Sequence, residues 1–136
     1  MSFPRLLVLL LALLMLAGCP AGTRAPNADS QFSDYAVAVR WNEFDKAIAF
    51  VDPQLRQAQA LTDLERERYK LFQVTGYEVK DRQVQANGDI LQVVEIRVVN
   101  RDTQIERVVT DRQAWRLDAA AKRYWLVSGL PDFSAR

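Results

Sequence analysis

The feature that most constrains the fold is a change in the spacing of apolar residues near Val74. Before this point, apolar side chains recur three and four positions apart, which is the spacing of an amphipathic helix. After it they alternate with polar side chains, as in a half-buried strand. Helices followed by antiparallel strands predict an α+β domain, with N-terminal helices packed on a curved four-stranded sheet.

Two of the predicted helices precede residue 53. The first has an apolar stripe made of Phe32, Tyr35, Ala36 and Val39. Its expected N-cap is Asp29 or Ser30. Asn42 is expected to cap the second helix, whose stripe is made of Phe44, Ala47, Ile48 and Val51. That helix is expected to end at Asp52, because the residue before a proline is driven out of the helical region.

A third helix is predicted just before the sheet. Thr62 and Glu65 match a capping box, in which each residue hydrogen-bonds the other's backbone N–H. The apolar residues expected on this helix are Leu61, Leu64, Leu71 and Phe72. Gly76 follows, and we expect it to mark a bend or bulge where the chain enters the sheet.

Two turn signals divide the second half into strands. Asn87-Gly88 predicts a type I′ hairpin turn, which requires positive φ at both central residues. In the strand that follows, the residues predicted to face the core are Ile90, Val94, Ile96 and Val98. Glu95 and Arg97 are predicted to face the other way. The remaining predicted elements are a turn at 100–103, a strand at 104–117, a loop at 118–122 and a strand at 123–128.

The composition excludes several kinds of chemistry. The 136-residue chain has no histidine, and its one cysteine is Cys19. This removes Ser-His-Asp and Cys-His nucleophiles and zinc sites built from His or Cys, so we expect no metal and no cofactor. Any catalysis would have to use carboxylates, Tyr or Lys as the catalytic groups. With 18 basic and 17 acidic residues, the chain has no basic footprint for nucleic acid.

The N-terminal residues have the pattern of a leader peptide. Arg5 precedes an aliphatic run, and residues 6–18 are too short for the ~20 residues that a membrane-spanning helix needs. Leu16-Ala17-Gly18-Cys19 closes the run and resembles a bacterial lipobox. This resemblance implies signal-peptidase recognition through Leu16, Ala17 and Gly18, and lipidation of Cys19. The alternative is a secreted soluble protein whose single cysteine lies here by chance.

The lipobox divides the chain into three parts. Residues 1–18 are the predicted signal peptide, 19–29 the lipidated cysteine with a flexible tether, and 30–136 the folded domain. The expected location is the cell envelope, with the lipid in the outer membrane and the domain facing the periplasm. The expected partners are therefore the membrane, through the lipid, and an unidentified protein or small ligand.

The domain resembles the NTF2-like fold, also called cystatin-like or SnoaL-like. The resemblance rests on Trp-Asn-Glu-Phe-Asp-Lys-Ala at 41–47 and on the hairpin from Trp115-Arg116-Leu117 to Tyr124-Trp125-Leu126. The ending at 125–133 also resembles small uncharacterised proteobacterial lipoproteins. The fold implies a cone with helices laid across a bent sheet, often with a pocket between them. Many proteins of this fold also form homodimers through the sheet.

The best candidate for a functional carboxylate is Asp111. Strict alternation puts it and Gln113 on the apolar face with Ile105, Val109, Trp115 and Leu117. A carboxylate there would have a raised pKa and could act as a base, as in ketosteroid isomerases of this fold. A bulge near Val109 would instead turn Asp111 to solvent, and an Arg partner would neutralise it. The candidate pocket residues are Trp41, Tyr77, Asp111, Gln113 and Trp115, although such aromatic residues also commonly fill a core.

Three classes of function follow from these features. The first is a non-catalytic, lipid-anchored module that binds a partner or ligand or assists envelope assembly, with no catalytic residue. The second is a small-molecule enzyme that uses a carboxylate in the cone. The third is a structural subunit of an envelope complex. The composition favours the first.

Overall fold

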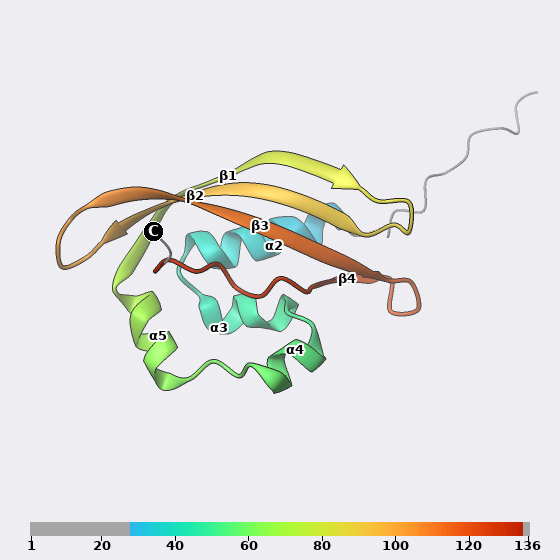
Figure 1. Ribbon diagram of the computed structural model, residues 1–136, viewed down its shortest axis with the longest axis horizontal. Helices are drawn as coiled ribbons and strands as arrows, with labels where there is room; N and C mark the ends of the chain where they lie inside the picture. Colours follow the sequence, from blue (N-terminus) through green and yellow to red (C-terminus); the bar gives the residue numbers. More distant parts are fainter. Residues whose placement is uncertain (1–27, 135–136) are drawn as a thin grey trace, which may run out of the picture.

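The computed structural model describes residues 28–134 as helices followed by an antiparallel sheet, which confirms the predicted α+β class (Figure 1). The leader, Cys19 and the tether up to residue 27 lie outside the described residues. The helical segments are α2 (Ala28–Arg40), α3 (Phe44–Ala47), the 3₁₀ turn η2 (Ile48–Phe50), α4 (Pro53–Ala58) and α5 (Asp63–Lys70). None of the helices in this part of the chain is both long and apolar enough to span a bilayer.

The sheet is an open meander in which each strand pairs with the next. Its strands are β1 (Phe72–Val84), β2 (Ile90–Asn100), β3 (Glu106–Asp118) and β4 (Arg123–Leu126), in the order β1-β2-β3-β4. Figure 1 shows the sheet curving over α2, with α3, α4 and α5 further from it. The C-terminal segment, residues 127–134, runs back from β4 between the sheet and these helices. This arrangement places the core between α2 and the inner face of the sheet.

The inner faces of α2 and β2 match the sequence pattern. Phe32, Tyr35 and Val39 are buried on α2, and the predicted inward residues of β2 are all 0% exposed: Ile90, Val94, Ile96 and Val98. The expected N-caps, Asp29 and Ser30, lie within the first turn, because α2 already includes Ala28. Asp29 stabilises the helix from the first turn, since a carboxylate interacts favourably with the partial positive charge of a helix N-terminus.

Asn42 does not cap the second helix, which corrects the sequence prediction. It follows α2 with a positive φ of 59°, and Glu43 is the residue that precedes α3. The Asn42 side chain instead pairs with β1: its Nδ2 donates to the carbonyl of Phe72 at 2.7 Å, and its Oδ1 accepts from the N–H of Val74 at 3.0 Å. Asn tolerates this left-handed conformation, so one residue both ends α2 and holds the start of the sheet.

The prediction that the chain leaves the helical conformation at Asp52 is right, but a further helix begins there. The second helix is shorter than expected, because α3 passes into η2 and Val51 is extended. Asp52 then caps α4: its Oδ1 accepts from the N–H of Gln54 at 2.9 Å, and Pro53 occupies the first helical position. Proline suits that position because its missing N–H would be unpaired anyway.

The capping box of the third helix is confirmed, but the predicted apolar face is wrong. Thr62 Oγ1 accepts from the N–H of Glu65 at 3.2 Å, and Glu65 Oε2 accepts from the N–H of Thr62 at 2.7 Å. Leu64 is 63% exposed and Leu71 is 41% exposed, while Phe72 already belongs to β1. The side chain that α5 packs against the core is Tyr69. Of the four predicted residues only Leu64 lies within α5, and its side chain is turned to solvent.

The bulge predicted near the start of β1 and the turn predicted after its end have different outcomes. The expected bulge at Gly76 is confirmed, since the pairing with β2 shifts between Val74 and Gly76, and it shifts again between Val79 and Asp81. The turn after β1 is not type I′, because of its two central candidates only Gly88 has positive φ, at 87°. The N–H of Gly88 donates to the carbonyl of Gln85 at 2.9 Å, so the glycine follows a turn that starts one residue earlier than predicted.

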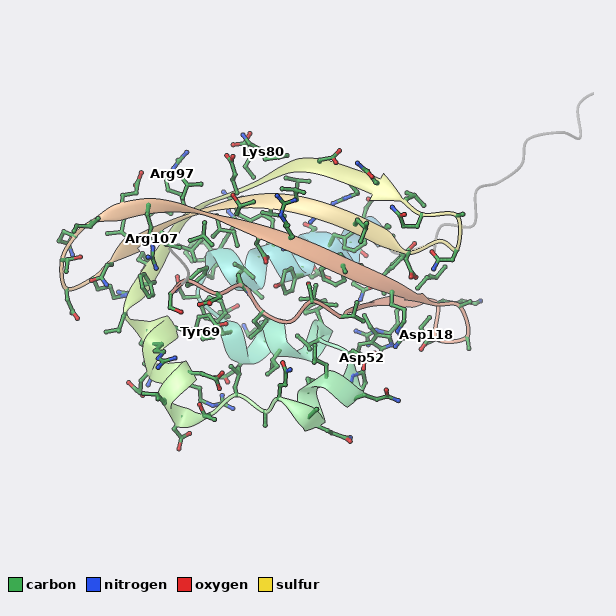
Figure 2. All side chains as sticks on the ribbon, in the orientation of Figure 1. Asp52, Tyr69, Lys80, Arg97, Arg107 and Asp118 are labelled. Atoms are coloured by element: carbon green, nitrogen blue, oxygen red, sulfur yellow. The ribbon has the colours of Figure 1, made fainter. Side chains whose placement is uncertain are left out.

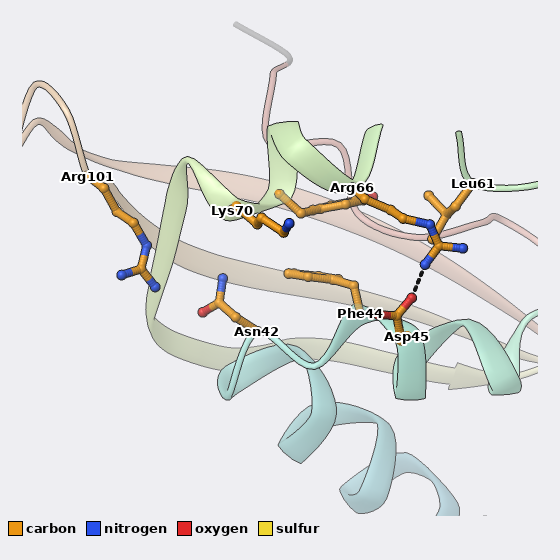
Figure 3. Close-up of a pocket in the computed structure, with 8 residues that line it drawn as sticks. Asn42, Phe44, Asp45, Leu61, Arg66, Lys70 and Arg101 are labelled. Carbon is orange, nitrogen blue, oxygen red and sulfur yellow. Dashed lines mark hydrogen bonds and ion pairs between the residues drawn. The ribbon is translucent and has the colours of Figure 1, made fainter. Parts of the chain in front are cut away.

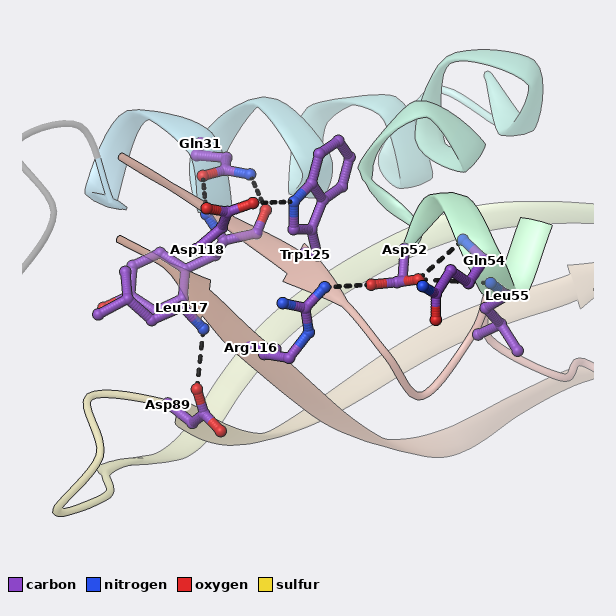
Figure 4. A network of polar contacts seen from close by, with 10 residues as sticks. Gln31, Asp52, Gln54, Leu55, Asp89, Arg116, Leu117, Asp118 and Trp125 are labelled. Carbon is purple, nitrogen blue, oxygen red and sulfur yellow. Dashed lines mark hydrogen bonds and ion pairs between the residues drawn. The ribbon is translucent and has the colours of Figure 1, made fainter. Parts of the chain in front are cut away.

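Polar contacts join the β4 side of the sheet to the helical segments (Figure 4). Val51 forms a parallel bridge with Leu126, and the N–H of Asp52 donates to the Leu126 carbonyl at 2.9 Å. Arg116 forms an ion pair with the largely buried Asp52 carboxylate (Figure 4). The hydrogen bond that the Arg116 guanidinium donates to Asp52 in this pair lowers the pKa of Asp52. Gln31 of α2 adds hydrogen bonds to the Tyr124 backbone.

The outer face of the sheet carries charged side chains, as predicted. Figure 2 shows Lys80 and Arg97 on the side turned away from the helices. Lys80 Nζ lies 3.1 Å from Glu95 Oε2, and Arg97 Nε lies 3.7 Å from Glu106 Oε1. Exposed pairs of this kind add about 0–1 kcal/mol each to the free energy of unfolding, so this face is solvated and contributes little.

Candidate functional site

Four of the five candidate pocket residues come together between α2 and the sheet. Tyr77 lies on β1, while Asp111, Gln113 and Trp115 lie on β3 and face the helices. Trp41 does not join them: it lies just after α2 with 73% of its surface exposed. Among residues 28–134 no hydrogen bond or ring contact links Trp41 to the other four.

Gln113 is the centre of this group and is 2% exposed. Its Oε1 accepts from Trp115 Nε1 at 3.1 Å and from Gln92 Nε2 at 2.9 Å. Its Nε2 donates to Asp111 Oδ2 at 2.8 Å and to Tyr77 Oη at 3.0 Å. We call these five residues the inner polar cluster. Because each amide atom of Gln113 has at least two partners, the cluster is held in one arrangement by hydrogen bonds within the protein.

The structure places Asp111 on the inner face, as alternation predicted. The β2–β3 pairing runs without a shift from Val99 to Ile90, so no bulge turns the carboxylate outward. Burial raises the pKa of Asp111, and the hydrogen bond from Gln113 opposes this. No Lys or Arg among the described residues forms an ion pair with Asp111. The alternative of an Arg partner is therefore not found, and a neutral amide, that of Gln113, bonds the carboxylate instead. Ile105, expected on the same face, precedes β3 and is 64% exposed.

Tyr35, predicted as part of the apolar stripe of the first helix, carries a buried hydroxyl. It is 0% exposed, and its Oη has no hydrogen-bond partner among the described residues. Burial raises its pKa, and the nearby charge of Asp111 raises it further. Burial also raises the pKa of Tyr77, to about 12. Both phenols are therefore neutral at pH 7 and can serve as hydrogen-bond donors.

Aromatic rings fill the space around the inner polar cluster. Trp115 is 1% exposed, and its ring centroid lies 4.9 Å from that of Phe32 and 5.1 Å from that of Tyr35. Tyr35 in turn lies 5.7 Å from Phe50. Edge-to-face contacts of this kind are the preferred packing of aromatic rings. Of the main clefts in the described part of the chain, none is lined by Asp111, Gln113 or Trp115.

Three open clefts surround Tyr69 of α5 instead, with volumes of about 310, 270 and 160 Å³. The Tyr69 ring stacks on Phe44 with centroids 4.1 Å apart, and its Oη donates to the carbonyl of Pro131 at 2.9 Å. Phe133 completes this contact and is 3% exposed. Tyr69 therefore fixes α5 to the rest of the domain, and the space on either side of it stays accessible. We call these spaces the Tyr69 clefts.

The largest of the Tyr69 clefts has a basic rim (Figure 3). Arg66 and Lys70 reach it from α5, and Arg101 reaches it from the turn between β2 and β3. At one end Arg66 forms an ion pair with Asp45 (Figure 3). Sequence analysis missed this cleft because its residues are far apart in the chain and each, taken alone, is an ordinary surface cation.

The chemistry available in these sites is limited. Within the described residues no three Asp or Glu side chains gather as metal ligands would. The inner polar cluster offers one carboxylate with a raised pKa and one neutral phenol, Tyr77, and the neutral phenol of Tyr35 packs against it through Trp115. The Tyr69 clefts offer cations beside apolar walls. Comparisons with known protein families, with curated proteins and with solved structures found no match for this chain.

Proposed function

We propose that this protein is a lipid-anchored lipoprotein of the cell envelope, whose NTF2-like domain is a non-catalytic module that binds a partner or ligand or assists envelope assembly. In this proposal Cys19 carries the lipid, and the domain faces the periplasm close to the outer membrane. The observation that carries the binding role is the contrast between a filled interior and the open Tyr69 clefts. Ligand sites in proteins are typically concave and largely preformed.

The anchor is tested by replacing the lipidated residue. Cys19→Ala should abolish labelling by a lipid precursor and leave the leader uncut, while Thr23→Ala, four residues further on, should be processed normally. A chain with two or more acyl groups is held firmly at a membrane, because each buried methylene contributes about 0.8 kcal/mol. Unchanged processing and membrane retention of Cys19→Ala would contradict the anchor.

The binding role is tested by photo-crosslinking in intact envelopes. A photoreactive residue replaces Leu64 on α5, which is 63% exposed and adjoins Glu65, a lining residue of two Tyr69 clefts. In the control it replaces Val84 at the end of β1, which is 66% exposed and lines none of these clefts. Binding through the Tyr69 clefts predicts crosslinks from position 64 and few from position 84. Equal crosslinking from both positions, or none from position 64, would count against the clefts as the binding surface.

The second candidate is a small-molecule enzyme, and Asp111 is the observation that favours it. Its raised pKa and its lack of a cationic partner suit a general base, and the unpartnered Tyr35 hydroxyl suits a hydrogen-bond donor. Such a base would remove a proton next to a carbonyl group. The test is deuterium exchange at the α-carbon of cyclohexenone: the enzyme predicts exchange that Asp111→Asn abolishes, and the binding module predicts none.

A further inference from the structure

The largest Tyr69 cleft has three cationic side chains and one carboxylate among its lining residues. Arg66, Lys70 and Arg101 bring positive charge to it, and Asp45 is the lining carboxylate. Asp45 is already paired with Arg66, and Lys70 is paired with Glu67, which lies outside the lining. Arg101 has no carboxylate partner among the described residues, so the cleft has an excess of positive charge.

The backbone holds Arg101 in place. Its N–H donates to the carbonyl of Leu71 at 2.8 Å, which ties the β2–β3 turn to the end of α5. Asn100 Oδ1 accepts from the N–H of Thr103 at 2.9 Å and thereby fixes the same turn. The Arg101 guanidinium donates to Gln73 Oε1, a neutral acceptor on β1. The cation is therefore positioned before any ligand arrives, which reduces the entropy lost on binding.

The cleft also has an apolar wall and a suitable size. Phe44 and Tyr69 form a stacked pair beside it, and Leu61 lines the end at which Arg66 pairs with Asp45 (Figure 3). Figure 3 shows the Arg66–Asp45 pair at one end, Arg101 at the other, and Phe44 and Lys70 between them. Its volume of about 310 Å³ is at the lower end of the range of ~300–1,000 Å³ typical of small-molecule sites.

From this geometry we infer that the cleft between the α2–α3 turn, α5 and the β2–β3 turn binds a small anion, a phosphate or carboxylate group on an apolar body. The anionic group lies between Lys70 and Arg101, and the apolar body lies along Phe44 and Tyr69. The Arg66–Asp45 pair shows that a carboxylate is already held at the far end of the cleft. This inference names a ligand class for the binding role proposed above and rests on it.

The test is calorimetric titration of the full chain in a nonionic detergent with phenyl phosphate, inorganic phosphate and phenol. Phenyl phosphate should bind in a saturable manner and more tightly than either of its parts. Arg101→Gln and Lys70→Gln should each weaken binding about tenfold, because each removes a charge-assisted hydrogen bond. Arg97→Gln and Lys80→Gln, on the outer face of the sheet, are the matched controls and should change it less than twofold.

Three results would overturn the inference: no saturable heat with phenyl phosphate, equal losses in the outer-face controls, or unchanged binding in both cleft variants. Circular dichroism of each variant establishes that it is folded, and either cleft variant alone is sufficient for the comparison. Binding should also weaken at least threefold between low and high salt, because both cations are solvent-exposed.

A further arm identifies the source of the anion. Phosphatidylglycerol in mixed micelles with the same detergent, added before phenyl phosphate, should abolish the heat if the natural ligand is a lipid headgroup, and leave it unchanged if the ligand is soluble. Mixed micelles of phosphatidylcholine are the control. Absence of anion binding with position-64 crosslinks intact would overturn this inference alone. Anion binding without those crosslinks would instead contradict the proposed partner surface.

Discussion

The domain packs its helices against the sheet in two different ways. Along α2, buried aromatic side chains pack against those of β3 and β4, and Gln113 accepts hydrogen bonds from Trp115 and Gln92 beneath them. Around α5, no residue of the helix is buried, Tyr69 is its main contact with the core, and clefts open on both sides of it. One region is a continuous packed interior, and the other is a single anchor surrounded by accessible space.

This difference separates stability from binding. Removing a large side chain from a filled interior lowers the free energy of unfolding, because the surrounding residues only partly fill the cavity that is left. A helix held by one side chain can open locally without unfolding the sheet. We therefore expect substitutions along α2 and β3 to act on the whole domain, and those at α5 to act locally.

The largest effect is expected from Trp115→Ala. Removing this 1% exposed ring should lower the free energy of unfolding by about 3–5 kcal/mol, the usual cost of truncating a buried tryptophan. Urea unfolding followed by circular dichroism measures it. Trp41→Ala is the matched control, because this 73% exposed residue should change stability by no more than ~0.5 kcal/mol. Equal losses in the two variants would mean that the interior is not packed as described.

The next largest effect is expected from Gln113→Leu. Leucine fills the space, but it leaves the Trp115 indole N–H and a Gln92 amide N–H buried without an acceptor. Unsatisfied buried donors cost about 1–3 kcal/mol each, so with two of them we expect a loss of at least about 2 kcal/mol in the same measurement. Gln83→Leu, at an exposed site on β1, should be nearly neutral. A neutral Gln113→Leu would show that water or another group satisfies these donors.

A smaller and local effect is expected at α5. Thr62→Ala removes half of the capping box and should cost about 1 kcal/mol of helix stability. Amide hydrogen exchange should become faster throughout α5 while the amides of β2 keep their protection. Thr103→Ala, in an exposed turn, serves as the control. If the amides of β2 lost protection together with those of α5, the two regions would be one cooperative unit.

The smallest effect, and the only one expected to depend strongly on pH, is that of Asp111→Asn. Burial raises the folded-state pKa of Asp111 above its unfolded value of about 3.9. The charged carboxylate therefore destabilises the fold above the folded pKa, and this penalty disappears as the pH falls below the unfolded value. The variant should be slightly more stable than the parent at pH 7 and equal to it near pH 3. Lower stability at pH 7 would indicate a stabilising partner for the carboxylate.

Features that depend on local or alternating patterns were predictable from the sequence. The inward position of Asp111 follows from parity along an unbroken β3, and the capping box at Thr62 and Glu65 is a local signal. The α4 helix was also locally encoded, by Asp52 as N-cap and Pro53 at the first position, but the proline was taken only as a terminator.

Features that depend on distant residues were not predictable. Asn42 was expected to cap a helix, but its amide is used by the backbone of β1, 30 residues away. Leu64 was named among the apolar residues of the third helix and Tyr69 was not, because the contacts that select Tyr69 come from Pro131 and Phe133 near the end of the described residues. The basic cleft combines residues from α5 with Arg101 in the same way. Periodicity contains no information about such pairings.

The two irregularities in β1 have a consequence for self-association. β1 is an edge strand, and Thr75 and Lys80 are the extra residues at its two pairing shifts with β2. They divide its 13 residues into regular stretches of three or four. An extended segment of another molecule that pairs with this edge would find no regular stretch longer than four residues. At one of the two breaks it would also meet the charge of Lys80. Interrupted edges of this kind resist the open-ended strand addition that leads to aggregation.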